Sequence, residues 1–94
     1  MAERERDIIT VRGRFDGTST GAFLRIVQAV LGRGAHNVVV DLGEADVAAS
    51  GLRALAIAQA RVQGGGRRVV LKAPNSSTLR LLRDARLIDR FVIG

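Results

Sequence analysis

The chain has no cysteine, tryptophan or tyrosine, and its 94 residues include a single proline. Without cysteine there can be no disulfide framework, no thiolate nucleophile and no zinc site built on sulfur ligands. Because three phenylalanines are the only aromatic residues, the core must be built from Val, Leu, Ile and Ala. Hydrophobic residues make up 47% of the sequence, which predicts one globular domain over residues 1–94 with a single modest core.

Long apolar runs are also missing. The longest are far shorter than the roughly 20 residues that a membrane-spanning helix needs, and the charged start does not resemble a signal peptide. We therefore expect a cytoplasmic protein without membrane insertion. Residues 1–7 are mostly charged and are expected to be flexible.

The charge of the chain is unbalanced, with 15 Lys and Arg against 9 Asp and Glu and a net charge of +6. Such an excess permits nucleic acid or another acidic partner. The basic residues are spread along the chain, however, and no aromatic residues alternate with them to stack on bases. A solvated basic surface without direct nucleic-acid binding is the better prediction.

Strand-like and helix-like segments alternate along the chain. Strands are predicted at residues 8–14, 37–42, 68–72 and 91–93 from their β-branched and apolar composition. Between them lie three helical patterns, of which the first is the clearest, with apolar side chains at Phe23, Ile26, Val27, Val30 and Leu31. The order β-α-β-α-β-α-β requires parallel pairing with right-handed crossovers. The sequence thus predicts a small α/β domain with a largely parallel sheet and its helices mainly on one face, and it leaves open helices on both faces.

Ser50 is the residue most suggestive of chemistry. It follows a buried strand by eight residues and lies at the start of the second helix, before Gly51 and Leu52. A phosphate there would lie near backbone N–H groups that favour anions. The alternative is a helix N-cap, whose hydroxyl accepts from an N–H group near Leu52 or Arg53 and contributes about 1 kcal/mol. The sequence leaves both roles open.

Other polar residues fit structural roles. Asp16 is expected in an Asx turn or N-cap, and His36, which has no evident partner, in a surface loop. Asp41, Glu44 and Asp46 are too few for a hard-cation site. No metal or cofactor is therefore expected.

Two further features of the second helix are also explained without catalysis. Gly64, Gly65 and Gly66 follow this helix and precede a strand, the reverse of a phosphate-binding loop, and are read as a turn. A set of polar side chains on the helix is predicted to form a solvated face: Arg53, Gln59, Arg61 and Gln63. No nucleophile–base pair is evident, so we expect a protein that is not an enzyme.

Several short motifs, in order and spacing, resemble the STAS domains, and within them the bacterial anti-sigma factor antagonists. Gly13-Arg14-Phe15-Asp16 resembles the family's Gly-x-Leu-Asp start, and residues 38–42 resemble its Val-x-Leu-Asp-Leu strand. Residues 48–52 occupy the place of its Asp-Ser-Ser-Gly-Leu signature. Residues 64–73 and 74–91 resemble its Gly-Gly strand and its closing Leu-Leu segment.

The resemblance implies a mixed, largely parallel sheet with helices packed mainly on one face. It also implies a regulatory protein that binds an anti-sigma factor with serine kinase activity and is switched off by phosphorylation of the serine before Gly-Leu. Carried over, the phosphorylated residue is Ser50, and Asp16 matches an acidic residue of the partner face. The predicted partner-binding residues are Asp16, Ser19, Ser50, Gly51, Leu52 and Arg53, with Ser76 as a further candidate. A weak homodimer stays open.

The chain departs from the family at the signature, where Ala48 and Ala49 replace the Asp and the first Ser. Some STAS proteins work without phosphorylation, for instance as small subunits bound to the ATPase of a lipid transporter. The alternative hypothesis is therefore a STAS adaptor that regulates a transporter ATPase or a signalling assembly. A third hypothesis, a basic nucleic-acid binder, rests on charge alone.

Overall fold

The computed structural model describes residues 2–5, 8–34, 37–64 and 67–94. The expectations for His36, Gly65 and Gly66 fall outside these residues. The described strands form one sheet in the order β1-β2-β3-β4-β5. Their bounds are Ala2–Glu5 for β1, Ile8–Phe15 for β2, Val38–Val47 for β3, Val69–Lys72 for β4 and Val92–Ile93 for β5.

Pairing in the sheet is mixed but mostly parallel. β1 pairs antiparallel with β2, whereas β2, β3, β4 and β5 pair parallel to one another. The parallel strands are joined by crossovers that contain helices, as the alternating sequence pattern requires. The predicted α/β class and largely parallel sheet are confirmed.

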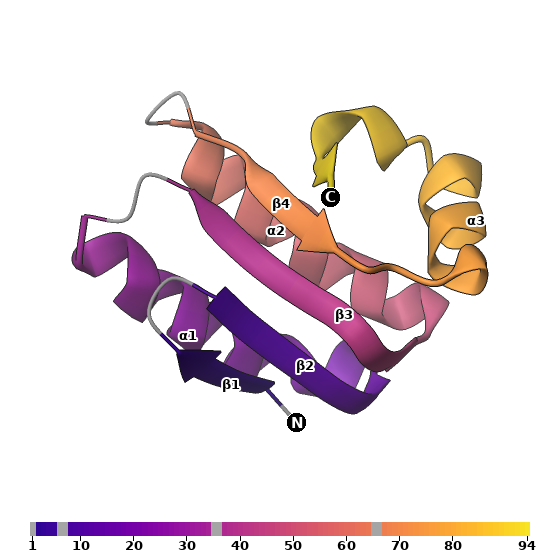
Figure 1. Ribbon diagram of the computed structural model, residues 1–94, viewed down its shortest axis with the longest axis horizontal. Helices are drawn as coiled ribbons and strands as arrows, with labels where there is room; N and C mark the ends of the chain where they lie inside the picture. The colour runs from indigo at the N-terminus through magenta and orange to yellow at the C-terminus, as the bar shows by residue number, and fades with distance from the viewer. Residues whose placement is uncertain (1, 6–7, 35–36, 65–66) are drawn as a thin grey trace.

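The helices lie mainly on one side of the sheet. α1 and α2 cover one face, while α3 lies beyond the ends of β3 and β4, so no helix of the described residues covers the opposite face (Figure 1). Three single-turn 3₁₀ helices, η1, η2 and η3, complete the fold. The bounds are Thr20–Gly32 for α1, Leu52–Gln63 for α2, Ser76–Asp84 for α3, Gly17–Ser19 for η1, Ala49–Gly51 for η2 and Ile88–Arg90 for η3.

The core lies between the sheet and α1 and α2. Alternate residues of β2 are buried toward the helices, and the predicted apolar face of α1 meets them with Phe23, Val27 and Val30. Phe15 and Phe23 pack edge to face, with ring centroids 5.1 Å apart. Most other buried side chains are aliphatic, as the scarcity of aromatic residues predicted.

The structure contains strand in two places where the sequence predicts none. No strand is predicted before residue 8, whereas Ala2–Glu5 forms β1 by backbone pairing to the outer edge of β2. The second predicted strand ends at residue 42, whereas β3 continues to Val47. The strand passes an irregularity after Asp41, where the carboxylate Oδ1 accepts from the Gly43 N–H at 2.9 Å, and alternating burial resumes at Ala45 and Val47.

Candidate functional site

The 3₁₀ turns η1 and η2 lie side by side, where β2 and β3 end. β2 and β3 are parallel and end at the same level, because Phe15 pairs with Val47 at the last position of the register. The turns that follow them are therefore neighbours. The Ala48 N–H donates to the Phe15 carbonyl oxygen at 3.0 Å. The Gly17 N–H donates to the Ser50 Oγ at 3.1 Å. The two turns are thus joined by a backbone bond and by the hydroxyl of Ser50.

Ser50 is exposed at the middle of η2, directly before α2. The N-cap position of α2 belongs to Gly51, and no side chain caps that helix end. The N-cap role considered for Ser50 is therefore wrong, since its oxygen accepts from η1 instead. The residue borders a shallow cavity of about 550 Å³ lined by Gly17, Thr20, Ala49, Ser50, Arg53 and Ile57.

Gly51 and Leu52 face the interior, not the surface predicted for partner binding. Leu52 is 7% exposed and belongs to the core. A Cβ at Gly51 would overlap the Phe15 carbonyl oxygen and would lie 2.9 Å from the ring carbon Cδ2. Glycine is needed here because the start of α2 touches the end of β2. In this structure both residues serve packing.

Asp16 organises η1. Its Oδ1 accepts from the Thr18 N–H at 2.9 Å and from the Thr18 hydroxyl at 2.6 Å, while the Arg14 Nε donates to its Oδ2 at 2.9 Å. The expected cap role is confirmed, and a capping box is completed by Ser19, whose Oγ accepts from the Asp16 N–H at 3.2 Å. The Thr18 hydroxyl, the Arg14 guanidinium and the Thr18 N–H together hold the pKa of Asp16 below its usual 3.8.

Of the remaining predicted residues, Arg53 and Ser19 lie close to the two turns, and Ser76 lies elsewhere. Arg53 is exposed on the first turn of α2 and lines the same cavity as Ser50. Ser19 supports Asp16 and is partly exposed. Ser76 begins α3 and does not line that cavity. The structure thus brings Asp16, Ser19, Ser50 and Arg53 to neighbouring turns.

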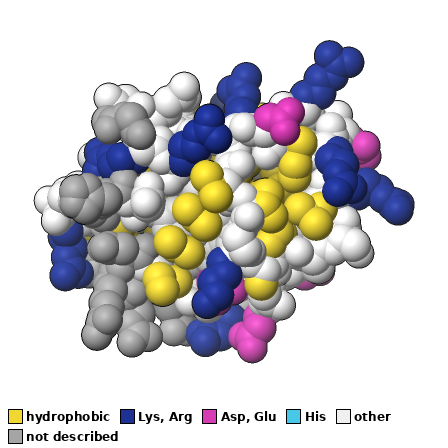
Figure 2. All heavy atoms as spheres, turned by 45° about the horizontal axis from the view of Figure 1, so that its top comes forward, with side chains coloured by type: hydrophobic (Ala, Val, Ile, Leu, Met, Phe, Trp, Pro, Cys, Tyr) yellow, Lys and Arg dark blue, Asp and Glu magenta, His cyan; other side chains and the backbone are white. Residues whose placement is uncertain are grey.

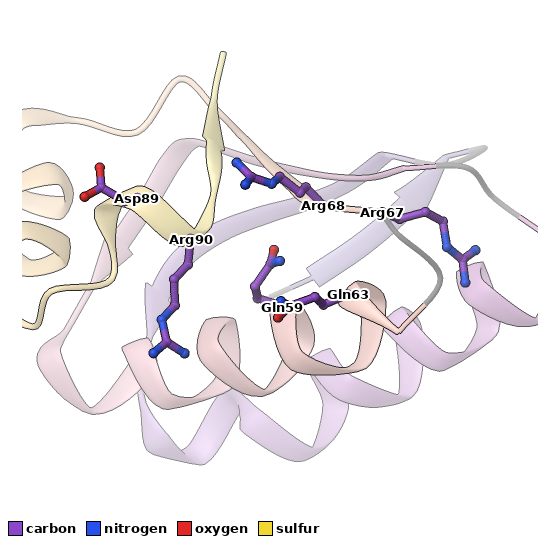
Figure 3. A pocket seen from close by; sticks show the side chains of 6 residues that line it. All are labelled: Gln59, Gln63, Arg67, Arg68, Asp89 and Arg90. Carbon is purple, nitrogen blue, oxygen red and sulfur yellow. The ribbon is translucent and has the colours of Figure 1, made fainter.

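A second cleft, of about 600 Å³, lies between α2, the start of β4 and η3, lined by Gln59, Gln63, Arg67, Arg68, Asp89 and Arg90. In Figure 3, Gln59 projects from α2 toward the strand, while Asp89 points away from the other labelled side chains. The Gln59 Oε1 accepts from the Val69 N–H at 2.9 Å, and Gln59 is 5% exposed. The prediction of Gln59 on a solvated face is therefore wrong. Its helical spacing with Leu52, Leu55 and Val62 was the signal for burial.

The described residues contain no group of three His, Asp or Glu side chains that could hold a metal ion. No helix among them is long and apolar enough to cross a membrane.

Comparison with known proteins relates this geometry to a family. The family model described as "Mlab, STAS domain" matches residues 1–93. The chain belongs to the STAS domain family. No curated protein matches the sequence.

Solved structures share the STAS fold over nearly the whole chain. A crystal structure of TM1081 from Thermotoga maritima, a suggested anti-sigma factor antagonist, superposes with a TM-score of 0.79 at 15% identity, covering 99% of this chain and 83% of that one. The NMR structure of TM1081 gives 0.80 at 14% identity, with coverages of 99% and 78%. The unphosphorylated anti-sigma factor antagonist SpoIIAA gives 0.77 at 13% identity, with coverages of 100% and 86%. At these identities the likeness concerns the fold.

Proposed function

We propose that this STAS domain is a non-enzymatic, cytoplasmic regulatory protein of the anti-sigma factor antagonist type. It binds an anti-sigma factor with serine kinase activity, and phosphorylation of Ser50 switches the binding off. The observation that carries the proposal is the position of Ser50, which is exposed two residues before the first residue of α2 and lies beside a surface cavity that includes Arg53. Likeness to TM1081 and SpoIIAA supports the general kind of function.

The physical basis of the switch is a change of surface charge. A phosphate adds about −1.5 to −2 charges at neutral pH. Next to the first turn of α2 this charge lies near backbone N–H groups and the positive end of the helix dipole, which stabilise anions. The fold therefore tolerates the modification. A partner that docks over Ser50, Arg53 and the cavity meets a surface of altered charge and shape.

Matched variants of Ser50 test the proposal. Wild type, Ser50→Ala and Ser50→Glu serve as baits in a pull-down from the source organism, with Ser77→Glu as a control, since Ser77 is exposed in the first turn of α3. Wild type, Ser50→Ala and Ser77→Glu should retain an ATPase-type serine kinase, and Ser50→Glu should lose it. Incubation of wild type with that kinase and ATP should place phosphate on Ser50, as read by mass spectrometry.

Thermal unfolding supplies the control for folding. Ser50→Glu should melt within about 4 °C of wild type, corresponding to less than about 1 kcal/mol for a domain of this size. A steep fall in melting temperature would contradict the proposal, because loss of the partner would then reflect unfolding.

A second candidate function is a STAS adaptor that regulates a transporter ATPase or a signalling assembly without phosphorylation. Ala48 and Ala49 favour it, since neither supplies a side-chain hydrogen bond at the start of η2. In that case wild type and Ser50→Glu would retain the same transporter ATPase or scaffold protein.

A further inference from the structure

Four aliphatic side chains form a row across the helix-free face of the sheet. Ile8 pairs in register with Val39, Val39 with Val70, and Val70 with Val92. Residues in register point to the same face of a sheet. Their neighbours along each strand, which include Ile9, Val38 and Val69, are buried toward the helices, so this apolar row points away from them.

The apolar row is open to solvent. Ile8 is 38% exposed and Val92 is 41% exposed, while Val39 and Val70 are partly exposed between them. Figure 2 shows hydrophobic side chains running as a band over this side of the molecule, with Lys and Arg side chains around it. Contiguous exposed apolar side chains on a soluble domain mark interaction surfaces.

The next outward-facing row carries charges. Thr10 pairs in register with Asp41, and Asp41 pairs with Lys72. Further along the strands, Arg12 and Glu44 already form an ion pair at 2.8 Å within the same chain. On the side of the apolar row toward the strand ends, the nearest charges are thus an acid on β3 and a base on β4, while Arg68 lies on the other side, two residues before Val70.

We infer that this face binds a second copy of the chain through a two-fold axis parallel to the strands, between β3 and β4. Such an axis places β3 of one copy over β4 of the other. Val39 then meets Val70 of the second copy, and Asp41 meets Lys72 of the second copy. Each contact occurs twice, as an isologous interface requires. The charges are complementary because the acid lies on β3 and the base lies at the same level on β4, and the axis exchanges these two strands.

Known sheet packing is compatible with this arrangement. Two sheets stack face to face about 10 Å apart with strands within about 30° of each other. At that angle Val39 and Val70 of the two copies stay in contact near the axis. The outer residues Ile8 and Val92 are displaced from their counterparts in the second copy. The interface therefore depends on β3 and β4.

The size of the face sets the strength of the dimer. Even if all four strands presented about five residues at a spacing of about 4.8 Å, the face would cover at most roughly 300 Å² per copy, and β4 and β5 are shorter than this. Stable complexes bury about 800 Å² per partner. The dimer is therefore weak, with a dissociation constant of roughly 0.1 to 1 mM.

Sedimentation equilibrium tests the inference, with interference optics because the chain has no Trp or Tyr. Between about 20 µM and about 1 mM, wild type should pass from monomer toward dimer. Asp41→Lys and Lys72→Asp each turn two attractive pairs into repulsive ones, so each should weaken association about tenfold. Asp46→Lys is the control, since it makes the same charge change further along β3.

An equimolar mixture of Asp41→Lys and Lys72→Asp separates contacts between copies from contacts within one. In the mixed dimer both pairs between copies are complementary again, whereas each chain keeps its own two like charges. The mixture should associate about as strongly as wild type. A wild type that stays monomeric throughout, or a mixture no stronger than its components with all variants folded by circular dichroism, would overturn the inference. Neither outcome depends on Ser50, so the proposed function is tested separately.

Discussion

At the scale of single residues, Gly51 shows how closely the signature segment is tied to the core. Its Cα lies against the carbonyl group and ring of Phe15, so a side chain there would meet backbone atoms that cannot rotate away. The Gly-Leu part of the motif therefore has a packing role. Ser50, one residue earlier, is exposed.

Gly51→Ala should destabilise the domain by about 1–3 kcal/mol, the usual cost of overpacking a filled site. Gly21→Ala is the matched control, because nothing lies within 4 Å of a Cβ at Gly21 in the first turn of α1. There alanine should stabilise by about 0.5–1 kcal/mol through its helix propensity. Urea unfolding followed by circular dichroism measures both, and equal effects of one sign would contradict the packing argument.

Ionisation of Asp16 in the η1 turn makes the stability of the domain depend on pH. Because its pKa in the folded protein is below 3.8, the carboxylate stabilises the fold at neutral pH, and this contribution is lost as pH falls through the lowered pKa. Asp16→Asn keeps an oxygen that can cap Thr18 but loses the charge beside Arg14. The melting temperature should therefore differ between wild type and variant more at pH 7 than at about pH 2. A difference that stays constant with pH would contradict the assignment.

At the scale of elements, the sheet ends on a very short strand. β5 pairs with β4 only at Val70 and Leu71, so the N–H of Val69 has no strand to bond to on that side. Gln59 from α2 supplies the acceptor at 2.9 Å. A helix side chain thus satisfies a backbone group that a longer strand would have paired.

Gln59→Ala should cost about 1–3 kcal/mol, because it leaves a buried N–H group without an acceptor. Gln63→Ala is the control, since Gln63 is exposed one turn later on the same helix and should change stability by less than about 0.5 kcal/mol. Amide hydrogen exchange adds a second readout, since the Val69 amide should exchange faster in the first variant alone. Equal stabilities of the two variants would contradict this role.

Elements with a strong periodicity of apolar residues were predictable from the sequence. Elements that depend on pairing with a neighbouring strand were not. The apolar spacing of α1 and the run at Val38–Leu42 match the structure because burial on one or both sides dictates the pattern. β1 was not predicted because this four-residue edge strand is held by backbone pairing to β2. Its charged sequence shows no alternation of apolar and polar residues that would indicate a strand. The continuation of β3 was hidden by Gly43, which the structure places at the irregularity beside Asp41.

At the scale of the whole molecule, the sequence indicates that the residues of the candidate site lie close together, but it does not indicate their contacts. Strand order in a parallel sheet brings the ends of β2 and β3 together, so Asp16 and Ser50 fall on neighbouring turns. The bond from Gly17 to Ser50 joins residues 33 positions apart, and no local pattern records it. Burial of Gly51 likewise follows from the approach of α2 to β2, which depends on tertiary packing.

The bond between the Gly17 N–H and the Ser50 Oγ gives the domain a built-in spectroscopic reporter. Gly17 lies on a different turn from Ser50, yet its amide proton is bonded to the oxygen atom that the proposed phosphorylation would modify. Any change in the electron density of that oxygen alters the proton's shielding. The chemical state of Ser50 can therefore be followed in real time from a glycine resonance, without a label on the serine.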